Sequence, residues 1–371
     1  MKVDSVLIFI SLLFSFAWLV LKDVASSGLL WIAVLRYVPL LLLYAKYIRW
    51  SFHAVVPILF PVFLIILSII GDSNYSLQGL LVVAMVPTCL YVFSKITFSH
   101  REIRILILLV FLSYLSYLVV SLLYRNIINP NQIGFTFLIL SLILFFCAYT
   151  NMSGKDAMTS LLIAVLVIAT LGLVLFTRSR NSLLVFLLLP VAFLFRRRFE
   201  RYLGILIWIV LILYFVYPWV YTQLAYSFSF RSSQDTIWMD QDIFSGREII
   251  WSYVYSELRN PSVFLFGGID TEWWGKSLHN SAMDIIVRYG VPSMVALALI
   301  IIFYFRSYIK ETNNNYKSLL LLVLVAMIWG LNESGMFLGY SFFLFLPYCI
   351  IHSKNIRPKS FVIQSGSDFK G

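Results

Sequence analysis

One histidine lies where it could act as a base. His279 falls in the polar stretch 277–281, directly before an apolar segment long enough to form a helix. Asn280 or Ser281 is a natural N-cap for that helix, and the positive end of the helix dipole favours an uncharged imidazole beside it. General-base catalysis near pH 7 requires a neutral imidazole, so His279 is the candidate base, the alternative being a structural residue at a helix start. The remaining histidines lie at the ends of apolar segments among basic residues: His53, His100 and His352.

Two arginines flank a serine between two apolar segments. Arg178 and Arg180 are followed by Asn181–Ser182, which opens the next predicted helix. Arginine binds phosphate through two parallel hydrogen bonds, and a helix N-terminus also attracts an anion. The short loops expected on the same side contain no matching acidic cluster. A bound anion therefore explains this pair better than arginines that only extend toward a membrane interface.

The composition defines the setting for these residues. Hydrophobic residues make up 61% of the 371 residues and charged residues 12%, with a mean hydropathy of +0.90. Soluble domains are about half apolar and about one quarter charged. A soluble enzyme, a disordered chain and a nucleic-acid-binding module are therefore excluded, and the net charge of +11 is interpreted as basic cytoplasmic loops. The three cysteines lie inside apolar runs without a CxxC spacing, so neither a disulfide framework nor a zinc site is implied.

Hydropathy predicts an all-α, polytopic integral membrane protein. A spanning helix needs roughly 20 apolar residues. Twelve segments meet this requirement, although 181–195 is short and would suit a tilted or re-entrant helix. The segments are 4–21, 28–46, 54–71, 78–96, 103–124, 133–149, 157–177, 181–195, 202–220, 284–305, 317–334 and 336–352.

The distribution of basic residues predicts the orientation. With the N-terminus in the cytoplasm, 18 of the 28 Lys and Arg residues fall on the cytoplasmic side and nine on the other, which leaves Arg36 within a span. Cytoplasmic loops carry such an excess, so both termini are expected in the cytoplasm. The chain then divides into spans one to nine (1–220), a large outer loop (221–283), spans ten to twelve (284–352) and a cytoplasmic tail (353–371).

The outer loop contains a predicted amphipathic helix. Ser245–Gly246–Arg247–Glu248 has the spacing of a capping box, and residues 247–258 place apolar side chains on one helical face. Asn260–Pro261 should end this helix, which we expect at the membrane surface, and the glycines at 267 and 268 should bend the chain back toward the bilayer. Asp240–Gln241–Asp242 resembles a metal-binding DxD pair but is better explained as a solvated acidic stretch.

Four motifs together resemble a known family. They are Thr177–Arg178–Ser179–Arg180–Asn181 opening a span; Gly246–Arg247 with Trp251; Asn260–Pro261 leading to Gly267–Gly268; and His279–Asn280 about ten residues before Gly290. In this order, with about twelve spans and one late outer loop, the chain resembles the O-antigen polymerase and O-antigen ligase superfamily of bacterial envelope polysaccharide assembly. The resemblance covers about residues 170–300. Ser293 departs from the ligase pattern, which has Gly, Thr or Tyr there, so the polymerase is favoured.

The resemblance implies a metal-independent, GT-C-like membrane glycosyltransferase without a cofactor, in the bacterial inner membrane with its large loop in the periplasm. Donor and acceptor would be undecaprenyl-diphosphate-linked oligosaccharides. Membrane lipid and a chain-length regulator protein would be further partners, and nucleic acid would not. Arg180 and Arg247 match the residues that hold the donor diphosphate, and His279 matches the catalytic histidine. Arg178, two residues before Arg180, is a further candidate for binding the diphosphate. The supporting residues would be Asn280, Trp251 and Arg288, the last of which also has the i,i+4 spacing of an ion pair with Asp284.

Three other functions remain open, one of them a purely structural membrane subunit, which would leave Arg178 and Arg180 unexplained. A ligase would transfer the glycan to the lipid A core instead of to another repeat unit. A lipid-linked oligosaccharide flippase can also have about twelve spans, but transporters tend to show repeated halves and polar residues at the membrane midplane. This sequence shows neither feature clearly.

Overall fold

The computed structural model describes most of the chain. The described residues are 2–21, 30–48, 51–71, 77–124, 129–151, 157–229, 237–238, 241–242, 247–271, 278–312, 314–333, 336–337 and 340–352. The predicted cytoplasmic tail, 353–371, and the capping residues Ser245 and Gly246 lie outside them.

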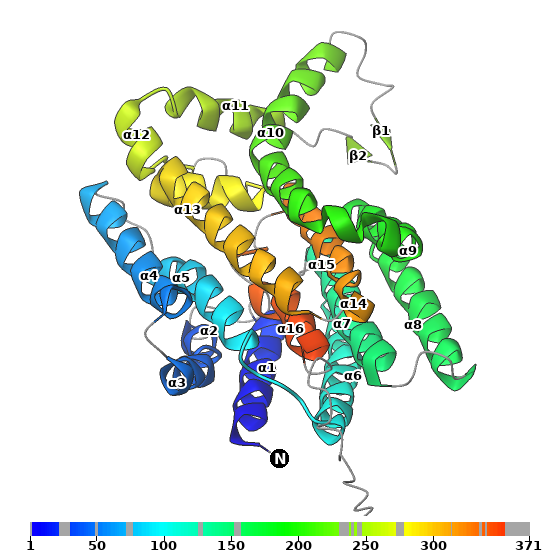
Figure 1. The fold of residues 1–371 in the computed structure, drawn as a ribbon. Helices are drawn as coiled ribbons and strands as arrows, with labels where there is room; N and C mark the ends of the chain where they lie inside the picture. Colours follow the sequence, from blue (N-terminus) through cyan, green and yellow to red (C-terminus); the bar gives the residue numbers. More distant parts are fainter. Residues whose placement is uncertain are drawn as a thin grey trace, which may run out of the picture.

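Apolar helices dominate the described residues (Figure 1). In the first half they are α1 (Val3–Leu21), α2 (Leu30–Leu35), α3 (Val38–Tyr47), α4 (Phe52–Ile70), α5 (Leu77–Phe93), α6 (His100–Leu123), α7 (Pro130–Asn151) and α8 (Ala157–Phe176). In the second half they are α9 (Arg180–Phe199), the 3₁₀ helix η2 (Glu200–Tyr202), α10 (Leu203–Ser229), α11 (Arg247–Glu257), α12 (Pro261–Phe266), α13 (Ser281–Glu311), α14 (Asn314–Lys317), α15 (Leu320–Met327), the 3₁₀ helix η4 (Ile328–Leu331) and α16 (Ser341–His352). Each of the twelve predicted apolar segments contains helix, so the all-helical prediction is confirmed.

Six helical stretches are long and apolar enough to cross a membrane, judged by length and composition. They are Val3–Leu21, Phe52–Ile70, His100–Leu123, Pro130–Thr150, Arg180–Ser227 and Ser281–Glu311. The remaining apolar helices are shorter, and the stretch Arg180–Ser227 joins two of the predicted spans.

Several helices turn their apolar side chains outward. Ile69 of α4, Leu123 of α6 and Leu194 of α9 each expose more than 70% of their surface. Helix α1 buries Ser5 and Ser11. Soluble proteins rarely expose apolar patches on this scale, so these surfaces are compatible with a hydrocarbon surrounding.

The second predicted span is broken. Residues 28–46 were expected to form one helix, but α2 ends at Leu35 and α3 begins at Val38. Pro39 lies in the first turn of α3 and has no N–H to donate to the carbonyl one turn back, so it starts a new helix instead of continuing the first. Arg36, at the break, is fully buried, with its guanidinium 4.2 Å from the centre of the Trp18 ring.

The predicted outer loop is shorter and more helical than expected. Helix α10 continues to Ser229, and α13 begins at Ser281. Between them lie the two-residue antiparallel strands β1 (Ile237–Trp238) and β2 (Gln241–Asp242), followed by α11 and α12, which lie above α13 in Figure 1. A short helix, 261–266, precedes the glycines at 267 and 268, because Asn260 caps it and Pro261 occupies its first turn. This helix includes Phe264–Phe266, which were expected to belong to the bend.

Three glycines join α12 to α13. Gly290 interrupts α13 with φ of 79° and ψ of 169°, a conformation that glycine adopts without steric penalty. The carbonyl of Val287, one turn earlier, accepts hydrogen bonds from Gly268 N at 2.8 Å and Ile269 N at 3.2 Å. A Cβ on Gly267 or Gly290 would lie within 2.6 Å of the opposite backbone. The backbones of the two segments therefore approach each other closely.

Candidate functional site

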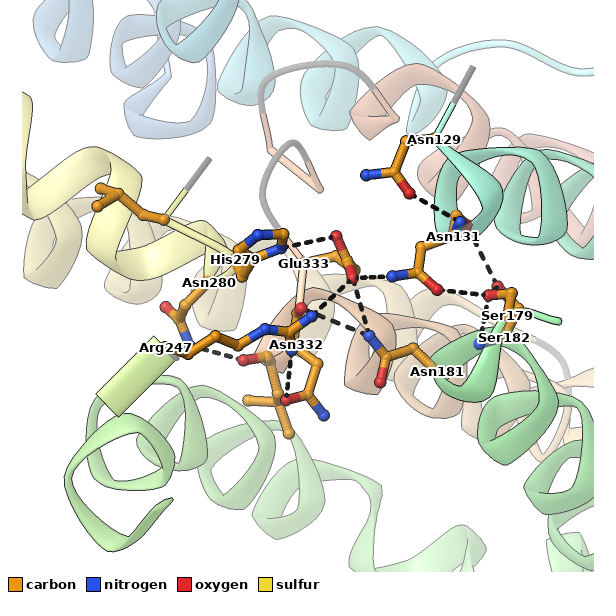
Figure 2. A network of polar contacts seen from close by, with 12 residues as sticks. Asn129, Asn131, Ser179, Asn181, Ser182, Arg247, His279, Asn280, Asn332 and Glu333 are labelled. Atoms are coloured by element: carbon orange, nitrogen blue, oxygen red, sulfur yellow. Dashed lines mark hydrogen bonds and ion pairs between the residues drawn. The ribbon is translucent and has the colours of Figure 1, made fainter. Parts of the chain in front are cut away.

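A buried carboxylate lies where several chain segments meet (Figure 2). Oε1 of Glu333 accepts hydrogen bonds from Asn131 Nδ2 at 2.5 Å and Asn181 Nδ2 at 3.0 Å. Nη2 of Arg247 lies 3.3 Å from the same oxygen. Oε2 lies 3.4 Å from Nδ1 of His279. Helices α7, α9 and α11 and the segment before α13 thus each contribute one side chain to the surroundings of Glu333.

The helix η4 ends at Leu331, so the backbone carbonyls of residues 331–333 have no partner within a helix. Side chains from other elements donate hydrogen bonds to them. Asn280 Nδ2 donates to Leu331 O at 3.0 Å, and Ser281 Oγ donates to Glu333 O at 2.8 Å. Asn181 Nδ2 lies 3.4 Å from Asn332 O. The carbonyls at a helix C-terminus have no partner within the helix. The residues that bond them here belong to α9 and to the start of α13, so both elements determine the position of Glu333.

His279 directly precedes α13, as predicted. Asn280 is the N-cap, and its Oδ1 accepts hydrogen bonds from Ala282 N and Met283 N, both at 2.9 Å. Ser281, the alternative cap, has another role because its hydroxyl bonds Glu333 O and accepts from Met336 N at 3.0 Å. His279 has a φ of +54°, which is uncommon outside glycine and occurs where surrounding contacts impose it.

The arginine pair opens α9. Ser179 is the N-cap of this helix, and its Oγ lies 3.0 Å from Asn131 Oδ1 of α7. Arg180, the first residue of α9, is half-buried. Arg178 is exposed, with a φ of +53°. The structure therefore places Arg180 next to Asn181, whose amide bonds Glu333, and leaves Arg178 exposed at the surface.

Arg247 is the first residue of α11 and points into the site. Its Nη1 lies 3.4 Å from Asn332 Oδ1, which also accepts from the Tyr217 hydroxyl. Its Nε is buried and has no hydrogen-bond partner among the described residues. A buried N–H without a partner costs free energy, so this atom could donate to a ligand that enters here.

Trp251 connects α11 to the segment that carries His279. The indole is fully buried, and its Nε1 donates to Leu278 O at 2.7 Å. Its ring packs edge-on against Tyr221, with 4.9 Å between centroids. Trp251 is therefore a buried support for the peptide that precedes His279.

The apolar face predicted for α11 is buried. Ile250, Trp251 and Val254 are each fully buried. The Tyr255 hydroxyl donates to Phe215 O at 3.1 Å, and burial raises the pKa of this phenol. Helix α11 therefore packs this face against α10.

Arg288 and Asp284 lie further along α13. Asp284 is buried in the first turn, and Arg288 lies beside the Gly290 interruption, where its carbonyl carbon is 2.6 Å from the site of a Cβ on Gly267. The backbone of Arg288 thus belongs to the junction between α12 and α13.

Sequence reasoning missed Glu333, Asn131 and Asn332. All three lie within or beside segments expected to be spans, where a carboxylate is costly and usually functional. The polar pair Asn332–Glu333 between two apolar stretches was the available signal, but both residues were placed inside the predicted span 317–334.

The donors at the site suit an anion better than a metal. No group of three His, Cys, Asp or Glu side chains that could hold a metal ion occurs among the described residues. The side chains of 239–242, including the predicted DxD pair, lie outside the described residues. Arg180, Arg247 and the N-terminus of α9 all offer positive charge or N–H groups, which bind phosphate.

An apolar cavity of about 230 Å³ lies elsewhere, between α7, α8, α9 and α15. Its two hydroxyl groups, of Ser141 and Thr170, lie 2.6 Å apart and bond each other. This cavity offers no chemistry comparable to the site around Glu333.

Comparison of the chain with protein-family models, curated proteins and solved structures finds no match. Fold and site together define an all-helical protein with apolar helices of membrane-spanning length and a buried, charged site at the end where α11 and α12 lie.

Proposed function

We propose that this chain is a polytopic glycosyltransferase of the bacterial inner membrane that polymerises O-antigen or a related surface polysaccharide. In this proposal it crosses the membrane twelve times, has both termini in the cytoplasm, has a GT-C-like fold and works at the periplasmic face. The convergence of Arg247 and His279 on Glu333 is the observation that carries the proposal. These residues come from two separate motifs of the family resemblance. They meet beside Asn181, which belongs to the motif that opens α9.

The substrate of this reaction is a glycan linked to undecaprenyl diphosphate. Arg180 and Arg247 bind the diphosphate, with Arg178 at the surface nearby. They stabilise the negative charge that grows on the diphosphate as the glycosidic bond breaks, and such preorganised charge is often the largest contribution to catalysis. Ligand oxygens also supply an acceptor for the buried Nε of Arg247.

The transfer is a single displacement at the anomeric carbon. A hydroxyl oxygen of the acceptor, the terminal sugar of a second lipid-linked repeat unit, forms the new bond to this carbon. The diphosphate oxygen departs with the electron pair of the old bond, and His279 accepts the proton of the attacking hydroxyl. The diphosphate is a good leaving group without protonation, and displacement from the opposite face inverts the configuration.

A strain that lacks the gene tests this proposal. We expect its lipopolysaccharide to carry a single repeat unit, and the wild-type gene to restore a ladder of longer chains on a gel. His279→Ala should not restore the ladder because the base is missing, whereas His100→Ala, an exposed histidine in α6, should restore it.

Three outcomes contradict the proposal. Complete loss of O-antigen from lipid A would indicate a ligase. Movement of lipid-linked sugars across a reconstituted bilayer without elongation would indicate a flippase. A normal ladder from the His279→Ala variant, at wild-type protein level, would exclude the proposed base.

A further inference from the structure

The two oxygens of the Glu333 carboxylate have different surroundings. Oε1 is contacted by three donors, the amides of Asn131 and Asn181 and the guanidinium of Arg247. Oε2 faces Nδ1 of His279 at 3.4 Å. Because the amides of Asn131 and Asn181 bond Oε1 at 2.5 and 3.0 Å, rotation of the carboxylate is restricted, and Oε2 stays directed at the imidazole (Figure 2).

The amide that makes the shortest of these contacts is itself oriented. Ser179 Oγ lies 3.0 Å from Asn131 Oδ1, so a hydroxyl proton can meet the amide oxygen. A reversed amide would place its oxygen against the carboxylate, where two acceptors would repel each other. The carboxylate, which can only accept, therefore selects the orientation in which the Asn131 NH₂ group donates to Glu333, and the Ser179 hydroxyl is compatible with it.

Glu333 is placed to orient another residue and not to reach a substrate. Its side chain is 3% exposed, whereas that of His279 is 18% exposed. Oε1 already accepts from several donors and Oε2 faces the His279 ring, and burial limits the access of an acceptor hydroxyl to Glu333. His279 is the more accessible member of the pair.

Hydrogen bonds also fix the backbone at Glu333 and next to His279. Two residues after His279, the hydroxyl of Ser281 donates to Glu333 O at 2.8 Å. Trp251 bonds Leu278 O, one residue before His279. The left-handed conformation of His279 is thus enclosed by contacts on both sides, which is how a strained backbone persists at a functional site.

We propose that Glu333 is a positioning residue that determines which ring nitrogen of His279 carries the proton. A carboxylate accepts hydrogen bonds, so Nδ1 carries the hydrogen that points to Oε2, and Nε2 keeps its lone pair for the substrate. The catalytic consequence rests on the proposed function: Nε2 takes the proton of the acceptor hydroxyl, and Glu333 stabilises the imidazolium that results. The same division of roles operates in the Ser-His-Asp triad.

The tautomer of His279 can be measured without any assay of activity. The full chain is labelled with ¹⁵N-histidine, placed in lipid nanodiscs and observed by NMR, and the spectrum of His279→Gln identifies the His279 signals among those of the other three histidines. We expect the neutral His279 ring to be protonated at Nδ1. A ring protonated only at Nε2 overturns the proposal.

Kinetics of Glu333→Gln provide the second readout. We expect kcat to fall about a hundredfold or more, as when the carboxylate of a catalytic triad is replaced by an amide, with KM for the lipid-linked donor changing little. The acidic limb of the pH–rate profile should move to lower pH, because the imidazolium loses its neighbouring negative charge. Glu333→Asp should restore part of kcat. Loss of activity with an unmoved acidic limb overturns the proposal.

Glu102→Gln is the matched control, since Glu102 is also a buried glutamate, in the capping box of α6. It should lower stability without moving the acidic limb. Failure of this inference is distinguishable from failure of the proposed function. An Nε2–H tautomer disproves only the role of Glu333, whereas a normal ladder from His279→Ala disproves the base and leaves the measured tautomer unaffected.

Discussion

Arg247 has an unusual combination of contacts for a buried arginine. Two of its nitrogens lie 3.3–3.4 Å from Glu333 and Asn332, and the third is buried without a partner among the described residues. Contacts of this length are weak, and the planar guanidinium could form two parallel bonds to a phosphate in their place. The geometry therefore suits a residue that gains bonds when an anionic ligand arrives.

Arg247→Lys should weaken binding of undecaprenyl diphosphate roughly ten- to a hundredfold, the effect of losing about 1.5–3 kcal/mol of hydrogen bonding to a charged group. Lysine keeps the charge but cannot bind phosphate through a planar fork. The dissociation constant is measured with the purified protein in nanodiscs. Arg104→Lys, at an exposed position in α6, is the control and should bind as the wild type does. Equal affinities of the two variants would remove Arg247 from the binding site.

Several residues of the site around Glu333 lie at the N-termini of helices. Ser179 begins α9, Asn260 begins α12 and Asn280 begins α13, and each side chain accepts a hydrogen bond from a backbone N–H of its own helix. Asn280 also donates to Leu331 O, the carbonyl two residues before Glu333. The Asn280 amide therefore caps α13 and also bonds the C-terminal end of η4. This shared contact links the position of His279 to that of Glu333.

Gly290→Ala should destabilise the junction between α12 and α13. The new Cβ would lie 2.3 Å from Leu265 O, and alanine would be held at a φ of +79°. Strain of this kind costs about 1–3 kcal/mol, so we expect a lower Tm in thermal unfolding of the detergent-solubilised protein. Gly172→Ala in α8 is the matched control because its Cβ meets nothing within 4 Å. It should raise stability by roughly 0.5–1 kcal/mol. Equal Tm values would contradict the close approach of the two backbones.

The whole molecule separates apolar surface from buried charge. Helices such as α4 and α6 expose Ile69 and Leu123, while Arg36 and Glu333 are buried among other helices. This is the arrangement expected in lipid, where an exposed charge is costly and a buried one needs partners. In the proposed topology, the excess of basic residues marks the end that faces the cytoplasm.

Cysteine labelling tests this orientation. Ser256→Cys in α11 and Glu311→Cys at the end of α13 introduce thiols at exposed positions. The native cysteines, Cys89, Cys147 and Cys349, are buried and should react slowly. In cells with a permeabilised outer membrane, we expect an impermeant maleimide to label position 256 alone, and position 311 only after detergent is added. Labelling of position 311 first would reverse the proposed topology.

Local sequence was sufficient to predict the apolar helices, Asn280 as one of two candidate caps, and His279 just before a helix. Hydropathy and capping depend on neighbouring residues, so they can be read without a fold. The break at Arg36 was missed although Pro39 signalled it, because a hydropathy window averages over a single proline.

Only the tertiary structure revealed the role of Glu333 at the site. Its partner Asn131 lies 202 residues away, and Arg247 and His279 come from separate segments. The hydrophobic periodicity of one segment does not predict which side chains of distant helices will contact each other. Packing of α7, α9, α11 and α13 around the end of η4 brings these donors to one carboxylate, because a buried charge is stable only where the fold supplies its partners.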